Sequence, residues 1–448
     1  MKTPIIEKLN KLNDLNAISL HVPGHKNMTI GNLESLNISM DKTEITGLDD
    51  LHHPEDIILQ SMNLVKKHSD YTAYLLINGT TSGILSVIQA FNKEKGRVLL
   101  MRNSHKSVLH ALDISNQFGR FTEMIQSSNS LHYQQPLFNN LDQQKYKLAV
   151  LTYPNYYGET YDISRKINEL HNKHIPVLVD EAHGAHFGLQ GFPQSSLNYH
   201  ADYVVQSYHK TLPALTMGSM LFIHKDAPLR NEIIKYLNYF QTSSPSYLIM
   251  ASLESAQQFY DEYDEKIFFV KRNMVIKQLK RMGFEVIQVD DPLKLLIRYR
   301  GTTGDDIQAW LEEQHIYVEL ADEYQVLLVL PLWHNNDSYP FNDLLHRIAK
   351  IHLPKKQWEL KENFASPKLL TDSGEYKPFE SDKTRWLDFT KANGRVLAQH
   401  IVPYPPGIPT IIKGETITEN MIELLEDYYV SGLKIEGMTN NKILVEDE

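Results

Sequence analysis

The chain has 448 residues, a length that predicts two or three domains with a sizeable buried core. Hydrophobic residues make up 42% and charged residues 22%, as in ordinary globular proteins, and the net charge of −10 argues against a nucleic-acid-binding face. Cysteine is absent, which excludes disulfides, a thiolate nucleophile and a cysteine-ligated zinc site. The first residues lack the apolar core of a signal peptide, and no apolar stretch approaches the ~18 residues of a membrane span. We therefore expect a cytoplasmic protein that binds neither nucleic acid nor membrane.

The first 55 residues or so predict an irregular arm, and strand and helix patterns alternate after it. The expected strands are 73–77, 97–101, 147–152, 176–179, 203–206 and 219–223. Helical periodicity fills most of the gaps, for instance at 82–91 and 163–174. This alternation predicts an α/β fold with a mostly parallel sheet that is covered by helices on both faces.

A helical stretch over 247–279 is expected to leave this first domain, and a second begins near Gly283, where strands resume. Further strands are expected at 294–299 and 325–330. Residues 362–383 are polar and predict a linker or exposed loop, and a tail follows from 384. The predicted division is an arm at 1–55, a large domain at 56–262, a small α+β domain at 263–361 and a tail region at 362–448.

Two strand ends carry the most informative residues. Asp180 ends the apolar run VLVD at 177–180, and Lys210 follows the next strand in SYHK at 207–210. Neighbouring parallel strands end in one crevice. A pyridoxal phosphate site needs such a pair, because the cofactor forms a Schiff base with a lysine and needs an acid at its ring nitrogen. Taken alone, Lys210 could be a solvated surface charge and Asp180 a helix cap.

Further motifs are spread over residues 21 to 409. They are HVPGHK at 21–26, TEITGLDDL at 43–51, NGTTS at 78–82, RNSHKS at 102–107, YPNYYG at 153–158, TSSPSY at 242–247 and PYPPGIP at 403–409. Together with the two strand ends, these motifs resemble the ornithine/lysine/arginine decarboxylase family. The resemblance implies the aminotransferase-like fold of the fold type I pyridoxal-phosphate enzymes, with a seven-stranded, mostly parallel sheet and a smaller α+β C-terminal domain.

The resemblance also implies the roles of individual residues. The glycine turn at 78–82 would bind the cofactor phosphate at a helix N-terminus, although a plain strand–turn–helix with a hydroxyl cap explains the same residues. His105 would stack on the cofactor ring, and His183 would orient Asp180 or contact the substrate carboxylate. The expected cofactor-binding residues are Gly79, Thr80, Thr81, Ser82, His105, Asp180, Ser207, His209 and Lys210, the expected catalytic residues are Lys210, His105, Asp180 and His183, and no metal ion is expected.

The implied reaction is decarboxylation of lysine, arginine or ornithine to the corresponding amine. The cationic side chain of such a substrate needs an acidic partner. The candidates in the sequence are Asp49, Asp50, Glu319, Asp322 and Glu415. Residues 403–409 cannot be helical, because their prolines remove backbone donors, and by resemblance they form a wall of the substrate pocket rather than a neutral linker.

The sequence departs from the family pattern at Met28, Thr46, Lys413 and Gln399. The last of these stands where many members have an acid. Three alternatives stay open: an aminotransferase or a carbon–carbon lyase, which share the scaffold, and, because of Gln399, a homologue with little turnover that serves as a regulatory or binding partner. A hydrolase would need a nucleophile elbow, which we do not find. The resemblance implies a homodimer with the active site between the subunits.

Overall fold

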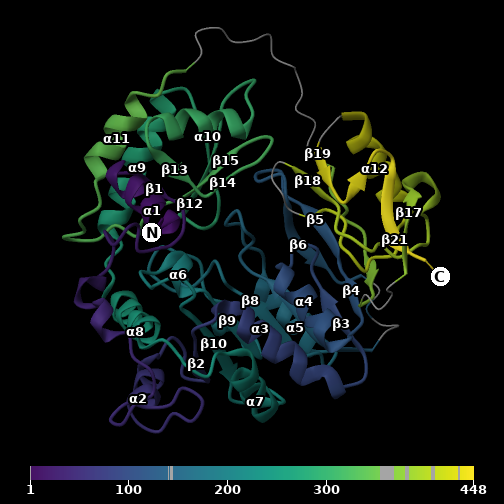
Figure 1. Cartoon of the computed structure of the whole chain (residues 1–448), viewed down its shortest axis with the longest axis horizontal. Helices are drawn as coiled ribbons and strands as arrows, with labels where there is room; N and C mark the ends of the chain where they lie inside the picture. The colour runs from purple at the N-terminus through teal and green to yellow at the C-terminus, as the bar shows by residue number, and fades with distance from the viewer. Residues whose placement is uncertain are drawn as a thin grey trace.

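The computed structural model describes residues 2–139, 141, 145–353, 368–378, 383–404, 409–431 and 434–447. Within them a central eight-stranded sheet has the order β16-β4-β3-β7-β8-β9-β10-β2 (Figure 1). The bounds are β2 Tyr71–Leu76, β3 Arg97–Leu100, β4 Gly119–Phe121, β7 Tyr146–Thr152, β8 Val177–Asp180, β9 Tyr203–Gln206, β10 Ser219–His224 and β16 Gly374–Tyr376. The five strands from β4 to β9 are parallel, whereas β10 and β16 run antiparallel to their neighbours.

Helices cover both faces of this sheet because its strands are apolar on both sides. One face packs against α3 (Gly79–Ala90), α4 (Lys106–Ser115) and α7 (Arg230–Phe240), and the other against α2 (Ile57–Leu64), α5 (Ile163–His171) and α8 (Tyr247–Glu262). The predicted α/β fold is confirmed, and all six expected strands are present within a few residues of their expected bounds. No helix in the described ranges is long and apolar enough to cross a membrane.

The N-terminal arm is more regular than expected. It forms α1 (Pro4–Asp14), β1 (Ile18–Leu20) and two short 3-10 helices, η1 (Leu33–Ser35) and η2 (Ile38–Met40). Strand β1 pairs in parallel with β13 (Ile316–Val318) of the small domain. The prediction of an irregular arm was therefore wrong at α1 and β1. A three-residue strand is too short to show periodicity, and its stability comes from a partner some 300 positions away.

The long helix expected over 247–279 is two helices, α8 and α9 (Lys266–Arg281). The chain turns between them, and the Asp264 carboxylate accepts the backbone N–H of Lys266, the first residue of α9, at 3.1 Å. The small domain that follows contains a four-stranded sheet, β11-β12-β15-β14, in the described chain. Its bounds are β11 Glu285–Gln288, β12 Lys294–Arg298, β14 Leu320–Ala321 and β15 Val326–Val329, with helices α10 Gly304–Glu313 and α11 Phe341–Ala349.

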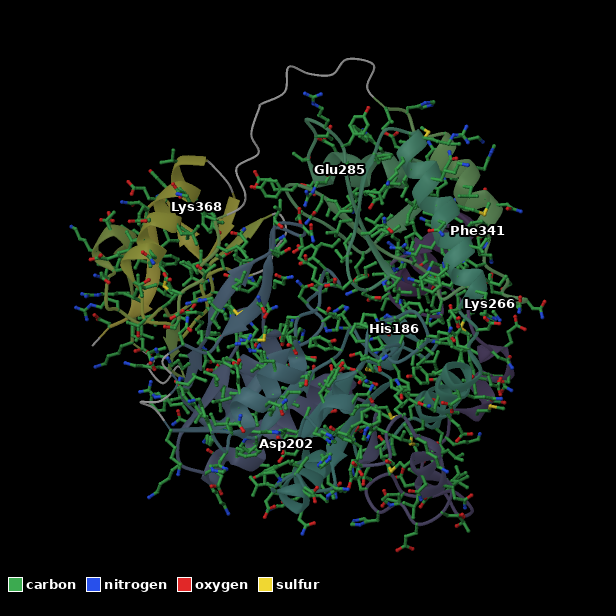
Figure 2. All side chains as sticks on the ribbon, turned by 180° about the vertical axis from the view of Figure 1, so that it is seen from behind. His186, Asp202, Lys266, Glu285, Phe341 and Lys368 are labelled. Carbon is green, nitrogen blue, oxygen red and sulfur yellow. The ribbon has the colours of Figure 1, made fainter. Side chains whose placement is uncertain are left out.

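The large and small domains share one buried hydrophobic cluster, to which the arm also contributes. A fully buried polar contact joins them as well, since His186 Nε2 lies 2.9 Å from the Asp291 carboxylate and both side chains are 0% exposed. Figure 2 shows His186 in the interior, with Lys266 and Phe341 on the small-domain side and Lys368 on the C-terminal region at the opposite side. The boundary expected at 262/263 stays a prediction, because the shared cluster crosses it.

The C-terminal region has a hydrophobic cluster of its own. It contains a three-stranded sheet, β17-β21-β20, the pair β18–β19, and α12 (Figure 1). The bounds are β17 Thr384–Asp388, β18 Val402–Tyr404, α12 Glu419–Ser431, β19 Lys434–Glu436, β20 Met438–Thr439 and β21 Lys442–Glu446. Residues 405–408 of the proline-rich motif lie outside the described residues, so the expected pocket wall stays a prediction.

Part of the expected linker at 362–383 is instead a strand of the large sheet. Strand β16 pairs with β4 at the sheet edge, and Tyr376 is buried there with its hydroxyl donating to the Asp113 carboxylate at 2.6 Å. The prediction of an exposed loop was wrong for this segment. The residues on either side of this strand are polar, so the sequence pattern did not indicate a three-residue strand with one buried tyrosine.

A buried ion pair also fastens the C-terminal region to the large domain. Arg102, just beyond β3, lies 2.8 Å from the Glu415 carboxylate, and the two side chains are only 3% and 1% exposed. Arg102 also donates to the Asp372 carbonyl, and Glu415 also accepts the backbone N–H of Ile412. Because both charged groups make further hydrogen bonds, the pair tolerates burial.

We predict that Glu415→Gln lowers the free energy of unfolding by about 3 kcal/mol, because it leaves the Arg102 charge buried and unpaired. Urea unfolding followed by circular dichroism measures this change. Glu169→Gln, which breaks an exposed pair with Arg165, is the control and should cost less than about 1 kcal/mol. Equal losses in the two variants would contradict a stabilising role for the buried pair.

Candidate active site

The polar residues singled out in the sequence meet at the edge of the large sheet where its parallel strands end. The segment containing His105 follows β3, Asp180 ends β8, and Lys210 follows β9 on the short helix α6 (Tyr208–Thr211). These three side chains lie close enough to influence one another electrostatically. The site lies where the topology of an α/β sheet leaves room for a ligand.

Lys210 is half-buried beside His183. Its Nζ is 3.1 Å from His183 Nε2. Burial lowers the pKa of Lys210, and the negative charges of Asp180 and Glu319 oppose that shift only in part. The lysine therefore releases its proton more easily than an exposed lysine, as a nucleophilic amine requires.

Asp180 is buried, with an exposed fraction of 5%, and its carboxylate accepts a hydrogen bond from the backbone N–H of Ala182 at 3.2 Å. A carboxylate can accept about four hydrogen bonds. Asp180 therefore keeps capacity for a protonated ring nitrogen.

His183 and His105 flank the lysine. Burial and the Lys210 charge hold the pKa of His183 well below its usual range, so its neutral ring can accept a hydrogen bond from Lys210 at Nε2. His105 is the N-cap of α4, and its Nδ1 accepts from Ser107 N–H and hydroxyl. Its ring surface is exposed in the single chain, yet partial desolvation by the crevice lowers its pKa, against the effect of Asp180.

The helix N-terminus of α3 forms a cradle beside the lysine. Gly79 has φ +72°, a conformation that favours glycine, and a Cβ there would meet no atom within 4 Å. Thr80 Oγ1 lies 3.2 Å from Ser207 Oγ, which joins the α3 end to the segment before Lys210. Thr81 is in the first turn of the same helix. Backbone amides, hydroxyls and a positive helix end suit a phosphate.

Ser82 and His209 are placed differently from the other expected phosphate residues. Ser82 is buried within α3, and its hydroxyl donates to the Gly79 carbonyl at 2.9 Å. His209 Nδ1 donates to the Gly218 carbonyl at 3.0 Å, and burial lowers the pKa of the ring to about 4. The neutral ring thus keeps Nε2 as an acceptor. Both residues support the cradle, and their contact with a phosphate stays a prediction.

The HVPGHK motif at 21–26 packs against α6 and the residue that follows it. The N–H of Gly24 donates to the His209 carbonyl at 2.7 Å, and a Cβ at Gly24 would come within 2.5 Å of the Leu212 carbonyl oxygen. Only glycine allows this approach. Met28, where the family has glycine, has φ +66° in the turn that follows, so the backbone retains the conformation that glycine favours.

Lys26, Lys294, Tyr156 and Glu319 form a second group that the sequence did not identify as a unit. Glu319 accepts the Tyr156 hydroxyl at 2.6 Å and the Val22 N–H at 2.9 Å. The Tyr156 ring contacts the edge of His183, with centroids 4.8 Å apart. Lys294 Nζ donates to the Tyr156 carbonyl at 2.7 Å, and Lys26 Nζ to the carbonyls of Val329 and His21. Burial lowers the pKa of Lys26 to about 7 and that of Lys294 to about 8.

The other acids proposed for substrate recognition are already engaged. Asp49 accepts four backbone N–H groups around the start of α2, and the Asp50 carboxylate accepts the N–H of His52. Asp322 accepts from Tyr157 and pairs with His132, and Glu415 pairs with Arg102. Of the five candidates, Glu319 alone exerts a charge effect on Lys210 among the described residues.

Several buried polar atoms at this edge have no hydrogen-bond partner in the described chain. They are Asn103 Nδ2 and Oδ1, Ser104 Oγ, Thr152 Oγ1 and His183 Nδ1. Buried polar groups are nearly always satisfied, so a group of orphans indicates a ligand site. The orphaned atoms, the free capacity of Asp180 and the open cradle at Gly79 all fit a pyridine ring that carries a phosphate.

A mostly parallel sheet with a lysine and an aspartate at adjacent strand ends defines a class of protein, the fold type I pyridoxal-phosphate scaffold. The chain belongs to the Orn/Lys/Arg decarboxylase family, whose major-domain model matches residues 3–282 and whose C-terminal-domain model matches residues 359–438. It is thereby a member of a family of amino-acid carboxy-lyases.

Relatives and solved structures agree with this assignment. A Bacillus subtilis protein, the uncharacterized protein YaaO, is 38% identical over 98% of this chain and 96% of its own length. The arginine decarboxylase of Bacillus subtilis is 28% identical over 97% of this chain and 95% of its length. The constitutive lysine decarboxylase of E. coli shares the fold, with a TM-score of 0.68 and 17% identity over 95% of this chain and 79% of that chain.

The lowered pKa of Lys26 predicts a pH-dependent stability. Its pKa is about 7 in the folded chain and 10.5 when unperturbed, so the unfolded state binds more protons between these values. The free energy of unfolding therefore rises with pH in this window, by about 1.4 kcal/mol per pH unit from this group. In Lys26→Met we expect the slope between about pH 8 and 9.5 to fall by that amount.

Urea titrations at several pH values measure the slope, which is a cleaner readout than absolute stability because the variant also loses two hydrogen bonds. The exposed Lys266, replaced in Lys266→Met, is the control and should leave the slope unchanged. An unchanged slope in Lys26→Met would show that Lys26 is charged in the folded protein.

Proposed function

We propose that this protein decarboxylates a basic amino acid with pyridoxal phosphate as its cofactor, and that arginine is the first substrate to test. The observation that carries the proposal is the crevice of Lys210, Asp180, His183 and His105 at the strand ends of a family scaffold. Four of the curated relatives are named arginine decarboxylase, at 27% to 28% identity, whereas the one named lysine decarboxylase is 21% identical.

Each residue of the crevice suits one part of the cofactor. Lys210 would hold it covalently, Asp180 would pair with its ring nitrogen, and His105 would lie against the ring. The N-terminus of α3, with Gly79, Thr80 and Thr81, would bind the phosphate together with Ser207. When bound there, the cofactor would supply an acceptor for the electrons of the bond between the α-carbon and the carboxylate.

The chain itself controls protons around the reacting carbon. Lys210 donates a hydrogen bond to neutral His183 over 3.1 Å, which orients the amine and, because the pKa of His183 is well below its usual range, leaves the proton on the lysine. Lys210 is thereby suited to return a proton to the α-carbon after carbon dioxide has left. Both residues are half-buried in the described chain, and this partial burial lowers the pKa values of both groups.

Glu319 is proposed to balance the positive charges at the site. Its carboxylate raises the pKa values of Lys210, Lys26 and Lys294 against the effect of burial. A cationic substrate side chain adds one more positive charge, which a carboxylate at this position would stabilise.

The aminotransferase and lyase alternatives share the scaffold, so the fold does not discriminate between them. A methionine aminotransferase from E. coli, for example, matches with a TM-score of 0.51 at 17% identity. The family membership favours decarboxylation, and identification of the reaction products distinguishes it from transamination and from lyase activity. A homologue with little turnover would bind the cofactor and release no gas.

We predict that the wild-type protein, incubated with pyridoxal phosphate, shows the visible absorbance of the bound cofactor and releases carbon dioxide from arginine, lysine or ornithine. Lys210→Ala should lose the absorbance and at least about 1,000-fold of the rate, because no other amine occupies this position. Spectrophotometry and carbon dioxide release measure the two effects, with Lys266→Ala as the control.

Formation of the amine without transfer of an amino group to a keto acid separates decarboxylation from transamination. Cofactor absorbance without carbon dioxide release from any of the three amino acids would contradict the decarboxylase proposal but would leave the cofactor assignment intact. Absorbance that survives in Lys210→Ala would contradict the assignment of the lysine.

We also propose a homodimer whose interface borders the site. Exposed apolar side chains gather on the arm, α2 and the segment next to the cradle, among them Ile38, Leu64 and Met217. The Met217 carbonyl accepts the N–H of Gly79 at 3.0 Å, so exposed Met217 lies next to the phosphate cradle. Large exposed apolar surfaces mark association sites.

Sedimentation velocity tests the dimer. We expect the wild type to sediment as a dimer and Ile38→Asp to shift toward monomer, because a charge would then be buried at the interface. Val430→Asp, an equally exposed position on α12, should leave the dimer intact. A monomeric wild type at micromolar concentration would contradict the proposal.

A further inference from the structure

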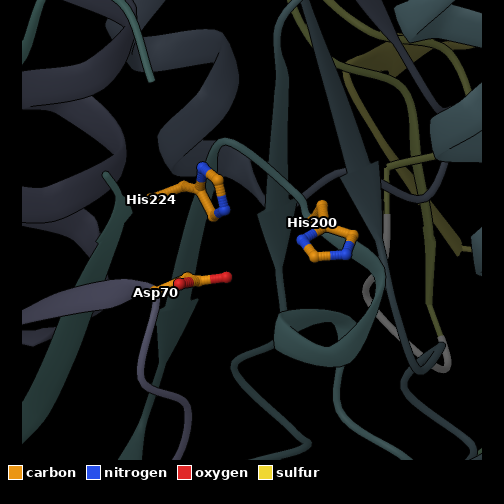
Figure 3. A group of neighbouring side chains, drawn as sticks. All are labelled: Asp70, His200 and His224. Carbon is orange, nitrogen blue, oxygen red and sulfur yellow. The ribbon is translucent and has the colours of Figure 1, made fainter. Parts of the chain in front are cut away.

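A cluster of two histidines and an aspartate lies at the opposite edge of the large sheet from Lys210. Asp70 directly precedes β2, His200 lies in the loop before β9, and His224 ends β10. Each contributes one potential ligand atom, and the three atoms lie within 4.8 Å of one another. Figure 3 shows the three side chains pointing toward a common point between them. None of them takes part in the proposed decarboxylation.

His224 provides an independent reason to expect a ligand. The residue is only 9% exposed, and its Nε2 is a buried atom without a hydrogen-bond partner in the described chain. Its Nδ1 lies 3.3 Å from the backbone nitrogen and 3.8 Å from the carboxylate of Asp226, so when Nε2 binds a metal the proton sits on Nδ1 and can be donated to that carboxylate after a small shift. A buried imidazole nitrogen without a partner costs free energy unless something else binds it.

The backbone already holds the cluster together. His224 lies opposite Tyr71 in the β10–β2 register, and its N–H donates to the Asp202 carbonyl at 2.9 Å. The Lys225 N–H donates to the Asp70 carbonyl at 2.8 Å. The ligand atoms thus come from three segments whose positions the sheet fixes, which reduces the cost of bringing them to one ion.

We propose that Asp70, His200 and His224 bind a divalent first-row transition metal ion, with Zn²⁺ as the best candidate. Two imidazoles and a carboxylate form a ligand set suited to zinc, and water would complete a tetrahedral site. Ligand atoms around tetrahedral zinc lie about 3.3 Å apart, since each is about 2.0 Å from the metal. The exposed His200 ring can supply most of the small inward movement needed.

The ion would act as a clamp between three segments of the sheet edge. It would link the start of the edge strand β2, the end of β10 and the entry to β9. Lys225 competes for Asp70, since its Nζ lies 2.9 Å from Oδ1, but an exposed ion pair is a weak competitor. Because this ion pair uses Oδ1, the other carboxylate oxygen of Asp70 can face the metal.

The test uses the full-length protein without a histidine tag, loaded with pyridoxal phosphate so that the histidines of the active site are covered. After treatment with a chelator, Zn²⁺ is titrated in competition with a chromophoric chelator, and the unfolding temperature is measured with and without Zn²⁺. We expect one ion per chain and a rise in unfolding temperature, because the ion binds the folded state.

His200→Ala should weaken this binding at least about tenfold and abolish the stabilisation by zinc. His200 is exposed, so this variant is expected to fold. His224→Ala should weaken zinc binding in the same way. His346→Ala removes a histidine on α11, remote from the cluster, and should leave binding unchanged. Binding that is equally strong in His200→Ala and His224→Ala, or no bound ion in the wild type, would overturn the proposal. Because the site is remote from Lys210, either result leaves the decarboxylase proposal untouched.

Discussion

The site depends on lowering the pKa of one amine, Lys210, in a place that is rich in positive charge. Burial lowers the pKa of Lys210, while Asp180 and Glu319 hold it back from falling further. Without burial Lys210 would be a solvated ammonium group. Without the two carboxylates, the ammonium form of Lys210, which is needed to return a proton, would be too high in free energy. The rest of the structure supplies these opposing effects from separate segments of the chain.

Each part of the fold contributes one contact to that balance. The large domain places Lys210 beside His183, and the His183 ring contacts Tyr156. The small domain brings Glu319 to the Tyr156 hydroxyl, and the N-terminal arm brings the Val22 N–H to the same carboxylate. A contiguous chain of contacts therefore joins three regions at the site. This explains why the arm pairs with the small domain through β1 and β13 rather than remaining free.

The sequence was sufficient for those features that local pattern determines. Strands such as β7 and β8 are continuous apolar runs, and polar residues follow at their ends, so the sequence alone places Asp180 and Lys210 at one edge of the sheet. The short strands β4 and β16 could not be predicted, because three residues carry no periodic signal and their burial depends on distant partners. Glu319 was one of five candidate acids in the sequence, but its contacts with Tyr156 and Val22 follow from the fold and not from its neighbours in sequence. No spacing rule would have joined Asp70, His200 and His224.

The most direct test of the proposed site is to identify the lysine that binds the cofactor. The protein offers several competing amines, because burial also lowers the pKa values of Lys26, Lys67 and Lys294. Reduction of the pyridoxal-phosphate-loaded protein with borohydride, followed by proteolysis and mass spectrometry, locates the modified side chain. We predict one modified residue, Lys210. Modification of Lys26 or Lys294 in its place, or none at all, would contradict the assignment of the site.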